Sequence, residues 1–208
     1  MANLASAFLA HLQAMPRSAL AAIALPPALA LALTLAAPLT AHLPPSRAKP
    51  FPTFAAFYPF YLSQHALPLT KLLHCAGTLC VAGFCAASPQ LLLALALGAL
   101  VGSRAFPLLR PLDSGLPEMA LTLGTYVACA TALTGSLALA LALPASAYGL
   151  AWAAHFLVEN NRPATFIYPL YSLLGDFVMF GECLLGRHAV LPQGWLAGAG
   201  EERQGKRK

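Results

Sequence analysis

The chain has 208 residues, of which 59% are hydrophobic and only 9% are charged, and its mean hydropathy is +0.69. This apolar share exceeds that of an ordinary soluble domain, so the composition predicts a membrane protein. The net charge is +5, but four of the basic residues lie in the last six positions. A nucleic-acid-binding protein would need a basic face, which this distribution does not provide. Five cysteines lie in apolar runs without a CxxC pair, as expected of small buried residues in a reducing compartment.

The N-terminal segment, residues 1–50, contains no acidic residue and includes an uncharged run at 19–43 that three prolines interrupt. An acid-poor, Ala-rich leader is one interpretation, and a kinked membrane helix is the other. Arg17 is the only basic residue before Arg47, which is few for an organelle-targeting peptide. The run is also long enough to cross about 30 Å of hydrocarbon, so the helix is favoured. The Pro-rich stretch 44–50 is then a linker.

Four further apolar segments follow the linker, with a tight turn at 87–90, a loop from Arg104 to Glu118 and a break at Pro144. The predicted membrane segments are 72–87, 90–103, 119–143 and 145–158. A last apolar segment, Leu170 to Leu185, carries Asp176 and Glu182, which are too costly for lipid exposure and predict an interfacial or inward-facing helix. The fold class is therefore an all-α polytopic membrane bundle with about four core crossings, an N-terminal apolar segment and an interfacial C-terminal helix.

Four crossings between His74 and His155 return the chain to its starting side, so both residues are expected at one face of the membrane. The basic residues next to the spans fall on that same side. They are Lys49, Lys71, Arg104, Arg110 and Arg162. By the positive-inside rule, this face is predicted to be cytosolic.

Polar residues concentrate in two motifs of this apolar chain. In the stretch from His155 to Phe166, His155 and Glu159 are four residues apart and share one face of a helix, which Pro163 is expected to stop about one turn later. The other motif consists of residues 58–65, which end in His65, together with His74. Each histidine alone is also explained as a hydrogen-bonded, interfacial or core residue. Three imidazoles and a carboxylate on one side of a bundle, however, suit a non-haem divalent metal such as iron, with open positions for substrate and oxygen.

Other polar residues have less specific interpretations. Arg162, with Asn160 and Asn161, is suited to an anionic head group, although Arg162 is also explained as an ordinary cytosolic anchor. Asp176 is a candidate acceptor for a metal-binding imidazole or a partner for Arg162. His11, His42 and His188 lack such neighbours in the sequence and are interpreted as incidental.

Several of these motifs together resemble a known family. They are Phe57-Tyr58-Pro59-Phe60-Tyr61-Leu62-Ser63-Gln64-His65, Leu73-His74 followed by Gly77-Thr78, Trp152-Ala153-Ala154-His155-Phe156, Glu159-Asn160-Asn161-Arg162-Pro163-Ala164-Thr165-Phe166 and Tyr168-Pro169-Leu170-Tyr171-Ser172-Leu173-Leu174-Gly175-Asp176-Phe177. Over residues 51–187 the chain resembles a family long catalogued as a domain of unknown function, whose fungal member is the iron-dependent 2-hydroxy fatty acid dioxygenase of phytosphingosine breakdown. Gln64 and Asn160 differ from the Glu and Lys of the typical form, and a segment near 101–146 looks inserted.

The resemblance implies an Fe(II) enzyme that uses dioxygen to shorten a 2-hydroxy fatty acid by one carbon in sphingolipid catabolism. It implies the metal ligands His65, His74, His155 and Glu159. Glu159 and Arg162 are the catalytic candidates, with Arg162 as a carboxylate clamp, and Arg162, Asn161 and Tyr61 are the substrate candidates. The expected partners are the 2-hydroxy fatty acid, dioxygen and membrane lipid, without nucleic acid.

The expected location is the endoplasmic reticulum membrane, as a multi-pass protein with its site on the cytosolic face. The expected division is an N-terminal segment 1–50, a catalytic domain 51–187 and a tail 188–208. The alternative is a non-enzymatic lipid-binding or scaffold protein whose polar residues join helices and need no metal. An ion transporter is weaker, because the chain shows no inverted repeat.

Overall fold

The computed structural model describes Ala14 and residues 16–190, and these residues form helices and loops without a strand. Five helical segments are long and apolar enough to cross a membrane, and they are Leu20–Thr40, Pro68–Ala87, Gln90–Leu109, Leu116–Thr134 and Leu137–Glu159. The predicted fold class is therefore confirmed. His11 and residues 191–208, which include most of the predicted tail, lie outside the described residues.

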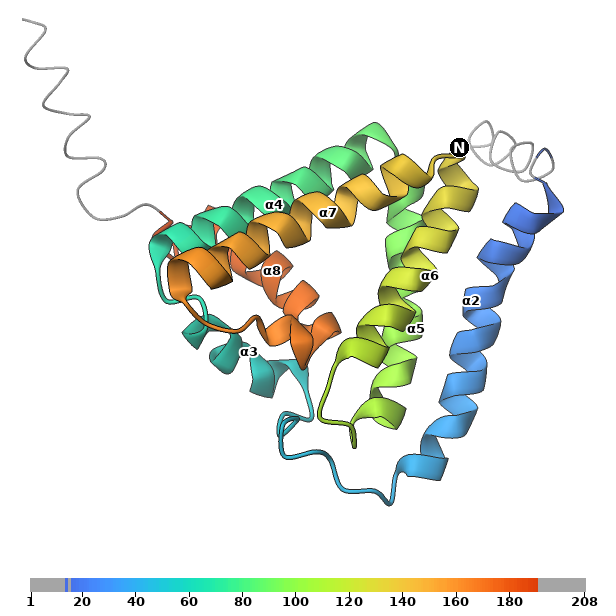
Figure 1. Ribbon diagram of the computed structural model, residues 1–208, viewed down its shortest axis with the longest axis horizontal. Helices are drawn as coiled ribbons and strands as arrows, with labels where there is room; N and C mark the ends of the chain where they lie inside the picture. The colour runs from blue at the N-terminus through green and yellow to red at the C-terminus, as the bar shows by residue number, and fades with distance from the viewer. Residues whose placement is uncertain (1–13, 15, 191–208) are drawn as a thin grey trace, which may run out of the picture. The chain divides into compact units, whose positions relative to one another are not determined.

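The described chain forms two compact units. The first contains the residues up to Pro50 together with Phe84–Leu143. Within it, α2 (Arg17–Ala36) packs against α5 (Gln90–Leu109) and α6 (Leu116–Thr134), and the three helices lie side by side in Figure 1. The preference for an N-terminal helix is thus supported, and α2 continues through Pro26 and Pro27.

Glycine lets α5 and α6 approach closely. A Cβ atom at Gly98 would lie 2.7 Å from the backbone carbonyl oxygen of Thr122, which is closer than real Cβ atoms come to such an atom. Close backbone contact through small residues is the usual way in which membrane helices associate, because lipid gives them no hydrophobic driving force.

The Pro-rich linker is tied to the loop between α5 and α6. Lys49 is fully buried, and its Nζ donates hydrogen bonds of 3.1 Å to the carbonyl oxygens of Leu109 and Ser114. Burial lowers the pKa of Lys49, while the charges of Glu118 and Asp113 partly offset this effect. Lys49 is therefore a buried residue that joins the linker to this loop. It is not the exposed flanking charge that the positive-inside argument assumed.

The prediction of a single helix over 119–143 is wrong. The helix α6 ends at Thr134, where Gly135 adopts a left-handed conformation with φ of 70°, and α7 (Leu137–Ala153) begins two residues later. The Ser136 Oγ accepts a hydrogen bond from the backbone N–H of Leu139, which caps the start of α7. A Gly-Ser pair thus ends one helix and begins the next.

Pro144 does not end a helix as predicted, since it lies inside α7. A proline removes one helical hydrogen bond, and this cost does not end the helix here. The predicted loop at 104–118 is shorter than expected, because α5 continues through Arg104 and Pro107 to Leu109. The turn at 87–90 is confirmed, since α4 (Pro68–Ala87) and α5 meet there.

The second unit contains Phe51–Gly83 and the described residues from Pro144 onward. It holds α3 (Phe54–Ser63), most of α4, the second half of α7 and α8 (Pro169–Leu184). Thr53 caps α3 by accepting a hydrogen bond from the backbone N–H of Ala56. Aromatic rings fill the space between α3 and the start of α8, and the Tyr168 hydroxyl accepts a hydrogen bond of 2.8 Å from the backbone N–H of Phe51.

The chain after α7 continues as a π-helical turn, Ala154–Glu159, followed by Asn160 with a positive φ of 54°. Asparagine is one of the few residues that tolerate this left-handed conformation. The helix therefore ends at Glu159 through the conformation of Asn160, before the expected stop at Pro163 is reached.

Candidate metal centre

His65 lies just after α3, and its ring is fixed by the last turn of that helix. The Nδ1 atom is 2.6 Å from the carbonyl oxygen of Tyr61. Because a carbonyl oxygen can only accept a hydrogen bond, Nδ1 carries the proton and Nε2 keeps a free lone pair. Burial, together with the neighbouring His74, lowers the pKa of His65 to about 3, so the imidazole is neutral at physiological pH.

His74 lies on α4, and its Nδ1 atom is 2.6 Å from Oδ1 of Asp176 on α8. The same oxygen accepts a hydrogen bond of 2.5 Å from the Tyr61 hydroxyl. Burial would raise the pKa of Asp176, but the charge and hydrogen bond of His74 and the bond from Tyr61 together lower it. Asp176 is thus a carboxylate that accepts a hydrogen bond from Nδ1–H of His74, so Nε2 is the His74 nitrogen that remains for a metal.

Gly175 makes this contact possible. A Cβ atom at this position would lie 2.8 Å from a carbon of the Tyr61 ring, so only glycine allows α8 to come this close. The neighbouring Asp176 is then within reach of both Tyr61 and His74. The sequence left two partners open for Asp176, and the structure selects the imidazole over Arg162.

His155 is held by the polar motif that follows it. Its Nδ1 atom is 2.7 Å from Oδ1 of Asn161, while Nδ2 of Asn161 donates a hydrogen bond of 2.9 Å to the carbonyl oxygen of Gln64. Because that carbonyl needs a donor, the orientation of the amide is determined, and Asn161 presents its oxygen to His155. Nδ1 of His155 therefore carries the proton as well.

The three imidazoles converge, although they come from three separate segments. The ring centroids are 4.4 Å apart for His65 and His74, 4.7 Å for His65 and His155, and 5.1 Å for His74 and His155. One ring nitrogen from each residue lies within 4.8 Å of the others, and all three residues are buried. Since each Nδ1 is already engaged, Nε2 is the nitrogen that each ring offers.

This donor set fits a metal ion. Among the described residues, the buried Nε2 atoms of His65 and His74 have no hydrogen-bond partner. Buried polar atoms are rarely left in this state, and a metal ion bound between these nitrogens would satisfy them. A second partner on the Nδ1–H of each ring is also the usual arrangement of metal-binding histidines. The prediction that the two histidine motifs meet is confirmed.

Glu159 does not belong to this group. Its Oε1 atom accepts a hydrogen bond of 2.7 Å from the backbone N–H of Leu67, so the carboxylate ties the π-helical turn to the start of α4. The spacing from His155 placed both side chains on one face of a regular α-helix. The wider π-helical turn changes the angle between the two side chains about the helix axis. Asn161 is therefore the residue whose side chain reaches His155.

The three substrate candidates are placed differently. Tyr61 is buried and its hydroxyl is hydrogen-bonded to Asp176. The side chain of Asn161 is hydrogen-bonded to His155 and Gln64. Arg162 is exposed, and its guanidinium carbon lies 5.3 Å from the centroid of the Phe166 ring. It makes no hydrogen bond or ion pair within the described part of the chain, so its donors are available to a ligand.

His188 is not isolated, contrary to the sequence interpretation. Its Nε2 atom is 2.9 Å from Oε2 of Glu182, which also accepts a hydrogen bond of 2.5 Å from the Tyr58 hydroxyl. This contact ties the end of α8 to α3. No spacing in the sequence indicates it, because Tyr58 and Glu182 are distant along the chain.

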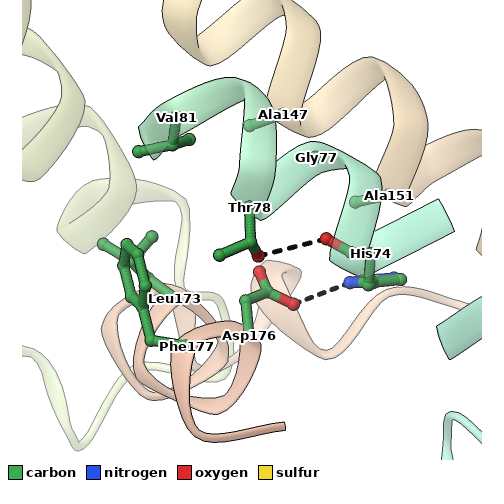
Figure 2. A pocket seen from close by; sticks show the side chains of 9 residues that line it. All are labelled: His74, Gly77, Thr78, Val81, Ala147, Ala151, Leu173, Asp176 and Phe177. Atoms are coloured by element: carbon green, nitrogen blue, oxygen red, sulfur yellow. Dashed lines mark hydrogen bonds and ion pairs between the residues drawn. The ribbon is translucent and has the colours of Figure 1, made fainter. Parts of the chain in front are cut away.

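A pocket lies beside the His74–Asp176 pair (Figure 2). It is lined by His74, Gly77, Thr78 and Val81 of α4, by Ala147 and Ala151 of α7, and by Leu173, Asp176 and Phe177 of α8. It is a small pocket, and part of it is open to the outside. This pocket could not be predicted from the sequence, because its lining residues come from three helices.

Comparison with known proteins finds one family. The chain matches the family described as 2-hydroxy-palmitic acid dioxygenase Mpo1-like over residues 51–106 and 118–188, which include the three histidines and Asp176. The resemblance seen in the motifs is thus confirmed. The interval left unmatched between these ranges is 107–117, so the expected insertion over 101–146 is wrong in its extent. No curated protein and no solved structure shows a significant match.

Proposed function

This chain belongs to the 2-hydroxy-palmitic acid dioxygenase Mpo1-like family, and we propose that it is an Fe(II)-dependent membrane dioxygenase. Its substrate would be a 2-hydroxy fatty acid, which it shortens by one carbon in the breakdown of sphingolipids. The observation that carries the proposal is the buried group of His65, His74 and His155, in which the Nε2 atoms of His65 and His74 have no hydrogen-bond partner among the described residues.

Iron is the metal proposed for this group. Imidazole ligands suit iron, as well as zinc and copper, and three of them leave positions open for other ligands. Bound there, iron would supply the one-electron and dioxygen chemistry that protein side chains lack. Zinc has no redox chemistry, which would leave the oxidative reaction named by the family without an oxidant-activating centre.

The protein would hold this metal through three different supports. The carbonyl oxygen of Tyr61, the carboxylate of Asp176 and the amide oxygen of Asn161 each accept a hydrogen bond from one Nδ1–H group. They keep every ring in the tautomer that directs a lone pair toward the metal. Asp176 adds a negative charge next to His74, which would make that imidazole the strongest donor of the three.

Arg162 is the proposed carboxylate clamp for the substrate. Its guanidinium is exposed over Phe166, near the motif that holds His155, and has donors that no described residue uses. A guanidinium presents paired N–H groups that match a carboxylate. Glu159 is proposed to support the site by holding the N–H of Leu67, and its earlier assignment as a metal ligand is not supported by its hydrogen bond.

The location that we propose is the endoplasmic reticulum membrane, with residues 51–187 as the catalytic domain and the site at the cytosolic face. This proposal is supported by five apolar helices and by the basic residues Lys71, Arg110 and Arg162 beside them.

The test is to purify the full chain in detergent without oxygen, measure its metals and incubate it with 2-hydroxypalmitate and air. We expect iron near one equivalent per chain and pentadecanoic products that stop forming after chelation. A protein that contains no metal and consumes no 2-hydroxy acid would instead be the lipid-binding or scaffold protein of the alternative interpretation.

A further inference from the structure

Tyr61 is connected to two of the three histidines of the metal centre. Its carbonyl oxygen accepts the hydrogen bond from Nδ1–H of His65, and its ring lies against the His65 ring with the centroids 4.0 Å apart. Its hydroxyl donates a hydrogen bond of 2.5 Å to Oδ1 of Asp176. The same oxygen accepts the hydrogen bond from His74, and Figure 2 shows this last contact. One side chain on α3 thus contacts His65 directly and His74 through Asp176.

The ring of Tyr61 has little freedom to move. The residue is only 1% exposed, and Phe57 and Tyr58 pack beside its ring. On the α8 side the ring fills the space left by the missing side chain of Gly175, where a Cβ atom would lie 2.8 Å from a ring carbon. Because the phenol ring is rigid, a fixed ring also fixes the position of the hydroxyl. The acceptors for His65 and for Asp176 are therefore held at a constant separation.

We propose that Tyr61 is a positioning residue, which holds His65 and His74 in the relative orientation that one metal ion requires. This inference rests on the proposed function, in which these histidines bind iron, and it assigns Tyr61 to the metal centre instead of the substrate. The torsion that orients a carboxylate is soft, so Asp176 needs a second contact to present Oδ1 to His74 in one direction. The Tyr61 hydroxyl supplies that contact. Partners that orient metal-binding imidazoles in this way contribute to metal affinity.

A purely structural role for Tyr61 would make it equivalent to Tyr58. Both tyrosines lie on α3, and the Tyr58 hydroxyl also donates a hydrogen bond of 2.5 Å to a carboxylate of α8, that of Glu182. Glu182 in turn contacts His188, which is not part of the metal centre. The two hydrogen bonds join the same two helices, but only the one from Tyr61 leads to a metal ligand. Tyr58→Phe is therefore the matched control for Tyr61→Phe.

The experiment measures metal binding to the purified full chain in detergent. Each variant is stripped of metal by a chelator and titrated with Fe(II) without oxygen, and separately with Co(II), whose visible absorption reports the geometry of its ligands. Tyr61→Phe keeps the ring on His65 and the backbone carbonyl, so only the contact with Asp176 is lost. We expect the Fe(II) affinity to fall about tenfold with an altered Co(II) spectrum in Tyr61→Phe, and to change by less than about twofold with the wild-type spectrum in Tyr58→Phe.

Two further comparisons test the route through Asp176. In an Asp176→Ala background, Tyr61→Phe should cause no further loss of Fe(II) affinity, because the hydroxyl acts through the carboxylate that is already absent. If Asp176→Ala does not fold, Gly175→Ala displaces the Tyr61 ring instead and should also weaken Fe(II) binding. Gly181→Ala is its control on the same helix, since a Cβ atom there meets nothing within 4 Å.

The outcomes separate this inference from the dioxygenase proposal. Equal Fe(II) affinities of Tyr61→Phe and Tyr58→Phe overturn the positioning role, even in a chain that shortens 2-hydroxypalmitate. A wild-type chain that binds Fe(II) and loses affinity on Tyr61→Phe, but turns nothing over, supports the positioning role and refutes the dioxygenase proposal alone. A wild-type chain that binds no Fe(II) overturns both.

Discussion

The metal centre makes a prediction about stability that does not depend on turnover. Without a metal, the buried Nε2 atoms of His65 and His74 are unsatisfied, which costs about 1–3 kcal/mol for each atom. A metal at about 100 times its dissociation constant adds about 2.7 kcal/mol to the free energy of unfolding. For a chain of this size, that is an increase in Tm of about 5–11 °C.

Replacing one ligand should remove most of this effect. Loss of a supporting partner alone lowers metal affinity by about 10–100-fold, and we expect His155→Gln, which loses a ligand, to reach at least the upper figure. At the same metal concentration the stabilisation then falls to about 0.4 kcal/mol, or about 1–2 °C. His65→Gln and His74→Gln should behave alike, and a double variant should lose no more than a single one, because ligands of one ion act as a unit.

The assay is thermal unfolding of the purified chain in detergent, with added Fe(II) without oxygen and with a chelator. His42→Gln is the matched control, because His42 is exposed and lies outside the metal centre, and His188→Gln should also keep the full response to the metal. The reasoning is refuted if chelation leaves the Tm of the wild-type chain unchanged, or if His155→Gln responds to iron as fully as His42→Gln.

Three further predictions concern the partner of His74, the carboxylate clamp and the orientation in the membrane. Asp176→Asn should lower iron affinity by about 10–100-fold, and excess iron should restore activity, because the ligand His74 remains; activity that no iron concentration restores would mean that Asp176 does more than position His74. Arg162→Ala should raise the KM for 2-hydroxypalmitate about tenfold with an unchanged iron content, and an unchanged KM would exclude the carboxylate clamp. A glycosylation reporter inserted near Gly115 should stay unmodified, as expected of a cytosolic loop, and its modification would contradict the proposed orientation.

Local properties of the sequence were sufficient for much of the fold. Apolar runs predicted membrane helices because a span needs about 20 residues without charge, and this requirement is read directly from the chain. The even number of apolar runs between His74 and His155 was enough to predict that both residues lie at the same face of the membrane. Helix ends were less certain, because Pro144 costs one hydrogen bond inside a helix, whereas Gly135 supplies the left-handed conformation that ends α6.

The residue types of the metal centre were also visible in the sequence, because three histidines in polar motifs are expensive in an apolar chain unless they are paired or bound. Their partners were not visible. Asn161, and not Glu159, reaches His155, because the rotation of side chains about the axis depends on a π-helical turn that periodicity does not reveal. Asp176 reaches His74 only because Gly175 lets α8 lie against Tyr61. Such contacts depend on how helices distant in sequence pack, so only the tertiary structure decides them.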